Sequence, residues 1–297
     1  MSTTNRMDIF SIRDIENLTG IKAHTLRVWE KRYGIIIPPT APGKHRMYDN
    51  NDLKHILRIA SLYHKGMKIS KIAEMSFEEI QKKTQAPDTR SNFEAFVEQL
   101  LEYTFDGNEA AFKKLMAELR EMMGEINMYL HVIFPFLSKI GELWLTDKIS
   151  PIQEHFTSNI IRNELIVAID KTFSGSPLKD PKFLLFCPTG EQHEIPLLFC
   201  HFMLRSRKVN SIYLGSNISE DILTSVVEKK EPEWLLVYLI TNFTDEEIEK
   251  YATDLAKKFE KQKILFCGPG FKNIDRLETN ASICRGIHEL VNFCSTV

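Results

Sequence analysis

Apolar residues recur at helical spacing in the first part of the chain and gather into short continuous runs in the last part. The stretches FEAFVEQLLEYTF (93–105) and IFPFLSKIGELW (133–144) repeat apolar residues every three or four positions, which predicts about four helices over 93–173. From Lys182 onward, the runs KFLLFCP, SIYLGS, EWLLVYLIT and KILFCGPG end in turn residues, with helical stretches between them. Such alternation predicts a parallel sheet covered by helices on both faces.

Two short helices joined by a tight turn are predicted in SIRDIENLTGIKAHTLRVWEKRYG (11–34). The apolar positions spaced to face inward are Ile12, Ile15, Leu18, Leu26 and Trp29. Gly20 permits the turn, so the second helix starts near Lys22 or Ala23. This helix then exposes a basic surface of Lys22, His24, Thr25, Arg27, Lys31 and Arg32. The geometry fits a DNA major groove, although an ordinary helical hairpin with a charged face has the same pattern.

The segment IIIPPTAPGKHRMYDNNDL (35–53) favours the DNA-binding interpretation. Its turn-forming residues, Pro38, Pro39, Pro42 and Gly43, are followed directly by Lys44, His45, Arg46 and, one residue later, Tyr48. A hairpin tipped with cations is a wing, whose tip can reach phosphates or the minor groove. Residues 51–65 then form an amphipathic helix that would brace it.

Charge is distributed unevenly between the two ends of the chain. Residues 1–76 carry 13 Lys and Arg against 7 Asp and Glu, a net charge of +6, whereas the remainder carries −8. A basic module on an acidic body indicates that only the N-terminal part meets a polyanion. The five cysteines all lie in the C-terminal third without a CxxC pair, which is typical of buried free thiols in a reducing cytosol: Cys187, Cys200, Cys267, Cys284 and Cys294. We therefore expect a cytoplasmic protein, since neither a membrane span nor a secretory signal is evident.

Two polar stretches divide the chain. TQAPDTRSN (84–92) and SGSPLKD (174–180) read as linkers. We therefore predict a multidomain α and α/β protein with a winged helix-turn-helix over 1–83, a central four-helix bundle over 92–174 and a Rossmann-like parallel sheet flanked by helices over 181–297.

The N-terminal residues resemble the MerR family of DNA-binding regulators. TLRVWEKRYG (25–34), then Pro38 and HRMY (45–48), match the family signature in order, spacing and residue type. The resemblance covers about residues 9–76 and implies a recognition helix near 22–33 and a wing near 37–48. It implies operator contacts by Arg27 and Arg46, with Tyr48 placing the wing. The whole predicted DNA-binding set is Lys22, His24, Thr25, Arg27, Arg32, Tyr33, Lys44, His45, Arg46 and Tyr48.

The rest of the chain resembles the cobalamin-sensing branch of that family. Those proteins carry a W…EH pattern in a helical bundle, followed by a Rossmann-like domain with an ExHxxG-like loop. The matching residues here are Trp144, Glu154, His155, Glu191 and His193, and YLGS (213–216) matches the second strand. The resemblance implies that His193 is the lower axial ligand of cobalt in adenosylcobalamin or methylcobalamin, and that Trp144, Glu154 and His155 face the upper side. The predicted cofactor site also includes Ser216, Tyr238, Gly268 and Gly270.

Several positions depart from the family patterns. Thr40 stands where MerR proteins often carry Arg, which removes one phosphate contact. Pro196, Tyr238 and Cys267 stand where the B12-type pattern has Gly, a small Ser and Gly. In such domains these small residues line the slot for the nucleotide tail, so the Tyr238 side chain would collide with it. Leu145 replaces a His that some light-sensing relatives carry after the Trp, which disfavours a bis-His light adduct.

Three interpretations of the C-terminal part remain open: cobalamin binding through His193 with an altered tail slot, a cofactor-free domain serving oligomerisation or partner binding, and a different small ligand in the same cleft. A cobalamin-carrying enzyme component is a fourth possibility for the whole chain. No P-loop, GxSxG or metal-hydrolase motif is present, and the basic wing favours a regulator over an enzyme. We expect a homo-oligomer, a dimer or tetramer, that binds double-stranded operator DNA.

Overall fold

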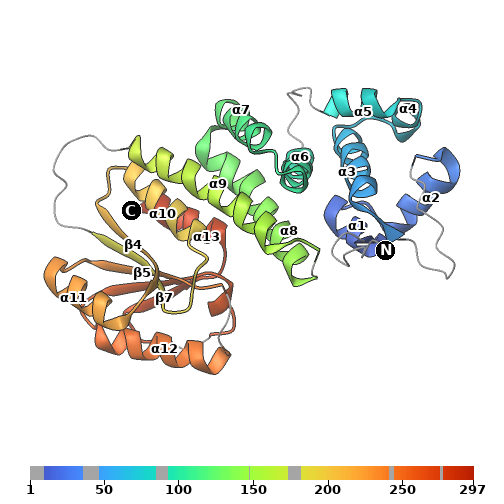
Figure 1. The fold of residues 1–297 in the computed structure, drawn as a ribbon. Helices are drawn as coiled ribbons and strands as arrows, with labels where there is room; N and C mark the ends of the chain where they lie inside the picture. The colour runs from blue at the N-terminus through green and yellow to red at the C-terminus, as the bar shows by residue number, and fades with distance from the viewer. Residues whose placement is uncertain are drawn as a thin grey trace. The chain divides into compact units, whose positions relative to one another are not determined.

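The computed structural model describes residues 10–35, 47–84, 93–146, 148–172, 182–240, 244–274 and 277–297. The chain forms two compact units, Met1–Thr157 and Ser158–Val297, and each is described here by itself (Figure 1). None of the helices in these ranges is long and apolar enough to cross a membrane.

The N-terminal unit begins with the predicted helix pair. Helix α1 (Ile12–Thr19) starts at a capping box in which the side chains of Ser11 and Asp14 bond each other's backbone amides. Gly20 ends α1 in the left-handed conformation, with φ of 70°, and helix α2 (Ala23–Tyr33) follows. The turn and the start of the second helix are therefore as predicted. Leu26 and Trp29 are buried on the inner face of α2.

A short antiparallel pair joins residues on either side of these helices. Strand β1 (Phe10–Ser11) pairs with strand β2 (Met47–Tyr48), and Phe10 lies opposite Tyr48. The next helix, α3 (Asn50–His64), begins at a capping box of Asp49 and Asp52 and packs against α1. Two further helices follow, α4 (Ile69–Ala73) and α5 (Phe77–Thr84). Most of the predicted wing, including Lys44, His45 and Arg46, lies outside the described residues.

The helices expected over 93–173 are present. They are α6 (Phe93–Asp106), α7 (Glu109–Met128), a π-helical turn η2 (Tyr129–Ile133), α8 (Phe134–Leu145) and α9 (Pro151–Asp170). Phe112, Tyr129 and Phe136 are fully buried among them. Their arrangement as a four-helix bundle stays a prediction. Helix α6 packs on α3, so this part of the chain and the helix-turn-helix part share one unit.

The C-terminal unit is built on a parallel sheet of five strands, in the order β4-β3-β5-β6-β7. The strands are β3 (Phe183–Pro188), β4 (Ser211–Ile218), β5 (Trp234–Tyr238), β6 (Lys263–Cys267) and β7 (Ala281–Cys284). This confirms the predicted parallel sheet. The chain leaves β3 for β4 on one side and returns to β5 on the other, so β3 and β5 flank a topological switch point.

Helices cover both faces of this sheet (Figure 1). One face carries α10 (Ile195–Ser206) and α13 (Ile287–Thr296), and the other carries α11 (Glu220–Lys230) and α12 (Asp245–Lys258). A 3-10 turn, η3 (Pro269–Phe271), follows β6. The five cysteines are all buried in this unit with free thiols, as the sequence predicted. Cys200 of α10 and Cys294 of α13 approach to 3.0 Å between their Sγ atoms.

Candidate functional site: an exposed basic helix and a histidine loop

The outer face of α2 presents the predicted basic residues to solvent. His24, Arg27, Val28 and Lys31 are spaced three or four residues apart, which puts them on one helical face, and all four are exposed. Arg27 makes no hydrogen bond or ion pair with any residue that the structure describes. Because a charged guanidinium with no internal partner remains available, this face can donate hydrogen bonds to acceptors such as a phosphate or the edge of a guanine.

The other predicted residues of α2 lie at its two ends. Lys22 caps the start of the helix, and its Nζ atom lies 3.1 Å from Oε1 of Glu16. Thr25 is half-buried, with its Oγ1 atom 3.3 Å from His24 Nε2. Arg32 is exposed in the last turn, and its guanidinium lies over the half-buried ring of Tyr33 at 5.4 Å.

Tyr48 is buried instead of exposed. Its hydroxyl donates a hydrogen bond to the Glu30 carboxylate of α2, and its backbone pairs with Phe10. The side chain therefore ties β2 to the basic helix and has no exposed surface for DNA. This position suits the role of placing the segment before it.

The loop between β3 and α10 fixes the orientation of His193. The Glu191 carboxylate is fully buried and accepts hydrogen bonds from the His193 Nδ1 atom at 2.6 Å, the His193 amide at 2.7 Å and the Ile240 amide at 2.8 Å. Burial raises the pKa of Glu191, but the hydrogen bonds from the His193 ring and these two amides outweigh burial and hold that pKa below its ordinary value. An anchored Nδ1 atom directs Nε2 away from Glu191, as in carboxylate–histidine–metal arrangements.

Further contacts fix the same loop, and sequence reasoning missed them. The Glu194 carboxylate accepts hydrogen bonds from Arg162 Nε of α9 and from the Tyr213 hydroxyl of β4. Two causes raise the pKa of Tyr213: burial, which is the larger, and the hydrogen bond to Glu194. The hydroxyl therefore stays protonated. The Gly190 amide donates to Asn217 Oδ1 at 2.9 Å. Arg162 follows the predicted Glu154 by two helical turns, and this spacing is the signal that could have drawn attention to it.

Pro196 fits its position without distortion. It occupies the first turn of α10, where a proline lacks only an amide that has no partner inside the helix. Ser216 is half-buried on β4. The three predicted residues of the upper side lie in the N-terminal unit: Trp144 on α8 is 46% exposed, and on α9 the exposed His155 pairs with Glu154 at 2.7 Å.

The donor set around His193 fits an axial ligand of a metal held by a macrocycle. Its side chain is 53% exposed, and no cluster of three His, Cys, Asp or Glu side chains among the described residues could hold a metal by itself. A single protein ligand is sufficient only where other donors, such as corrin nitrogens, complete the coordination.

The space between Tyr238 and Gly268, where the family pattern places a nucleotide tail, is too small to hold one. Gly268 adopts φ of 102°, and a Cβ there would lie 2.4 Å from the Leu239 carbonyl oxygen and 3.2 Å from Cζ of Tyr238. The Tyr238 ring is only 8% exposed and fills the space beside this glycine. A Cβ on Gly270 would likewise lie 3.0 Å from the Leu239 side chain, and Cys267 is fully buried. No cavity for a tail therefore lies between Tyr238 and Gly268.

Two family models match separate stretches of the chain, and two relatives match most of its length. The MerR HTH family regulatory protein model matches residues 10–79, and a B12 binding domain model matches residues 97–167. The HTH-type transcriptional repressor CarH of Myxococcus xanthus is 24% identical over 254 residues, which cover 83% of this chain and 84% of that protein. The repressor CarA of the same organism is 26% identical over 247 residues, covering 82% and 81%.

The fold resembles that of a solved corrinoid protein. The monomethylamine corrinoid protein of Methanosarcina barkeri superposes with a TM-score of 0.52 at 15% identity, covering 67% of this chain and 96% of that one. The stretch matched by the B12 binding domain model contains Trp144, Glu154 and His155, whereas Glu191 and His193 follow it.

Proposed function

Because the chain belongs to the MerR family of transcriptional regulators and carries a B12-binding domain, we propose that it binds operator DNA through α2 and senses a cobalamin held at His193. The relatives reported above are regulators, so the expectation of a regulator and not an enzyme is confirmed. The roles of individual residues below are part of the proposal.

The exposed basic face of α2 carries the DNA-binding proposal. Arg27 lies at its centre with no internal partner, and Lys31 extends the positive surface. In this proposal α2 enters the major groove of DNA, and residues 37–48 form a wing whose cations Lys44, His45 and Arg46 contact the backbone beside it. Two copies of the chain would bind inverted half-sites, since a two-fold protein matches a two-fold operator.

Arg27→Ala tests this assignment. A duplex selected from a random pool by the wild-type chain serves as the probe, and affinity is measured by fluorescence anisotropy over a series of salt concentrations. We expect the variant to bind at least about tenfold more weakly and to lose about one charge from the salt dependence. Lys114→Ala removes one exposed cation from α7 and is the matched control, with no expected effect. Equal affinity of wild type and Arg27→Ala would reject α2 as the reading surface.

The cofactor proposal rests on the hydrogen bond between Glu191 and His193. A bound cobalamin would supply a cobalt ion that accepts a nitrogen ligand. His193 would provide that nitrogen, while Glu191 holds the ring orientation and charge. Trp144, Glu154 and His155 would cover the upper side, and Ser216, Gly268 and Gly270 would border the corrin. Adenosylcobalamin and methylcobalamin are the proposed forms.

The sensing step would act through assembly. Ligand binding shifts an oligomerisation equilibrium only if the ligand prefers one assembly state, and a dimer or tetramer changes the spacing of paired recognition helices. Light scattering of the full chain with and without methylcobalamin measures this shift directly. If the protein retains methylcobalamin but its mass in solution does not change, cofactor binding does not control assembly and this sensing step is wrong.

The packing of Tyr238 over Gly268 favours a second function, in which the domain has no cofactor and serves oligomerisation or partner binding. An absorbance titration discriminates the two. A corrin spectrum that remains with the wild-type protein after gel filtration, and is lost in His193→Ala, supports the sensor. No retained spectrum with adenosylcobalamin or methylcobalamin supports the cofactor-free domain.

A further inference from the structure

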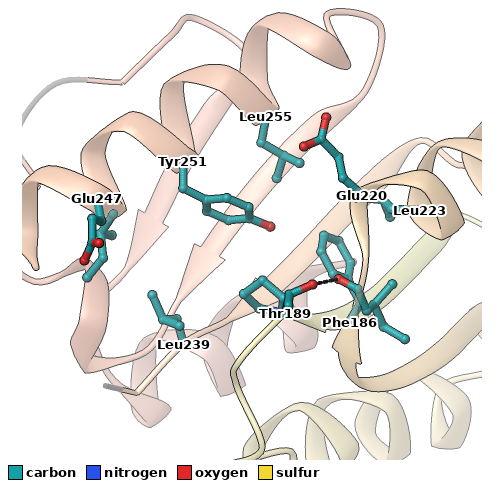
Figure 2. Close-up of a pocket in the computed structure, with 11 residues that line it drawn as sticks. Phe186, Thr189, Glu220, Leu223, Leu239, Glu247, Tyr251 and Leu255 are labelled. Carbon is teal, nitrogen blue, oxygen red and sulfur yellow. Dashed lines mark hydrogen bonds between the residues drawn. The ribbon is translucent and has the colours of Figure 1, made fainter. Parts of the chain in front are cut away.

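The C-terminal unit contains a cavity of about 360 Å³ on the α11 and α12 face of its sheet (Figure 2). Its walls are mostly apolar side chains from β3, α11, α12 and the end of β5: Phe186, Leu223, Leu239, Ile248 and Leu255. A volume of this size is typical of sites for small molecules. The free energy falls when an apolar molecule replaces water against such a lining.

This cavity is separate from the space beside Gly268. Phe186 and Val237 belong to the apolar core shared with α11 and α12. Side chains alternate along a strand, so their neighbours Cys187 and Tyr238 point to the opposite face, where α10 and α13 lie. A ligand in the cavity would therefore lie across the sheet from Tyr238.

Tyr251 contributes a polar group without a partner to the cavity. Its ring extends from α12 into the space between Glu220 and Thr189 (Figure 2), and its hydroxyl makes no hydrogen bond with any described residue. Thr189, in contrast, already donates to the Ile218 carbonyl at 3.2 Å. Burial raises the pKa of Tyr251, so the hydroxyl keeps its proton at neutral pH. Such a group can both accept from and donate to a ligand.

The two charged residues that line the cavity are both carboxylates. Glu220 and Glu247 stand among its lining residues, and no lining residue in the described part of the chain is Lys, Arg or His. Lys258 lies 2.5 Å from Glu220 Oε1, which offsets part of that charge. Hydrogen bonds from the Thr244 backbone and side chain lower the pKa of Glu247, which keeps this carboxylate ionised at neutral pH. The carboxylates attract cations and repel anions.

We propose that this cavity binds a small apolar amine, with its hydrocarbon part against Phe186, Leu223 and Ile248. The protonated amine would donate to the Tyr251 hydroxyl oxygen on the side of the cavity where Glu220 stands (Figure 2). An aromatic or branched aliphatic group of about ten heavy atoms matches the volume. The site gives the regulator a second ligand, independent of the corrin.

Phenethylamine and phenylacetate test this proposal, because they share a ring and a chain length but carry opposite charges. Isothermal titration of the full wild-type chain is expected to show one phenethylamine per chain, at least about tenfold tighter than phenylacetate. Tyr251→Phe is expected to weaken phenethylamine binding about fivefold, the usual contribution of one hydrogen bond.

Tyr238→Phe is the matched control. It removes the same atom from another buried tyrosine on the opposite face of the sheet, and the Tyr238 hydroxyl also has no partner among the described residues. We expect it to leave phenethylamine affinity unchanged. The proposal is overturned if wild type shows no saturable binding at millimolar phenethylamine, if both probes bind equally, or if the two tyrosine variants weaken binding to the same extent.

Discussion

Arg58 of α3 and Glu102 of α6 form an ion pair enclosed between two helices. Both Nε and Nη2 of Arg58 donate to Glu102 Oε1, at 2.9 and 2.6 Å, and the two side chains are only 8% and 7% exposed. The guanidinium also lies 5.1 Å from the centre of the Phe77 ring. The pair therefore links the helix after β2 to the first helix of the region matched by the B12 binding domain model.

Removing one partner of this pair should destabilise the N-terminal unit. Glu102→Ala leaves the Arg58 charge buried without a counter-ion, at a cost of roughly 3 kcal/mol in the free energy of unfolding. The Arg58→Met, Glu102→Leu double variant should recover most of the loss. Urea denaturation followed by circular dichroism measures both. Glu109→Ala, in an exposed pair with Lys113, should change stability by less than about 0.5 kcal/mol; a comparable loss there would contradict the role of burial.

His201 should make the C-terminal unit sensitive to acid. Burial, and then the nearby Arg205 charge, lower the pKa of this imidazole from 6.5 to about 4. The unfolded chain therefore takes up the proton first, so stability is fully present above about pH 6.5 and is lost as pH falls toward 4. The loss amounts to as much as about 3 kcal/mol.

His201→Gln should flatten this dependence, since glutamine can still bond Ser211 Oγ but does not titrate in this range. The measurement is the urea midpoint between about pH 7.5 and 4.5. His155→Gln alters an exposed histidine and serves as the control. A pH dependence equal to wild type in His201→Gln would assign the acid loss to other groups.

Glu191→Ala should weaken cobalamin retention even though it removes no metal ligand. Without the carboxylate, the His193 ring loses the contact that orients it, and loss of such a partner typically reduces metal affinity about 10- to 100-fold. Absorbance titration with methylcobalamin measures the effect. Glu228→Ala, at an exposed position of α11, should leave the titration unchanged. Wild-type affinity in Glu191→Ala would mean that His193 is held by other contacts.

Tyr238→Ser should change the preference between corrinoids. In wild type the filled space beside Gly268 gives the nucleotide tail no favourable contact, so methylcobalamin and tail-less cobinamide should bind with similar affinity. Opening the space should favour methylcobalamin over cobinamide by roughly tenfold. Parallel absorbance titrations give the ratio, with thermal unfolding as a check on the fold. An unchanged ratio would show that Tyr238 does not exclude the tail.

Periodicity was sufficient to predict the main elements of the fold. The spacing of Leu26 and Trp29 placed α2, and the apolar runs from Lys182 onward placed the strands of the sheet, because both signals are local in sequence. The contact between Glu191 and His193 is also local, only two residues apart. A motif of adjacent residues is therefore visible before the structure is known.

Contacts between distant segments were not predictable in the same way. Arg58 and Glu102 are 44 residues apart, and Arg162 and Glu194 are 32 residues apart, so neither pair leaves a periodic signal. The burial of Tyr48 depends on pairing with Phe10, which propensity does not specify. The cavity beside Tyr251 is the space left by two helices on a sheet, and sequence patterns carry no information about volumes.

All five thiols are buried, and all lie beyond Thr157 in the C-terminal unit. A thiol reagent added to the intact protein can therefore react only when that unit opens. Opening of the N-terminal unit exposes no cysteine and does not change the labelling rate. Rates of labelling would thus report the dynamics of one half of the molecule without engineered probes. A ligand that rigidifies this half should slow the modification of Cys200 and Cys294 in proportion to its binding.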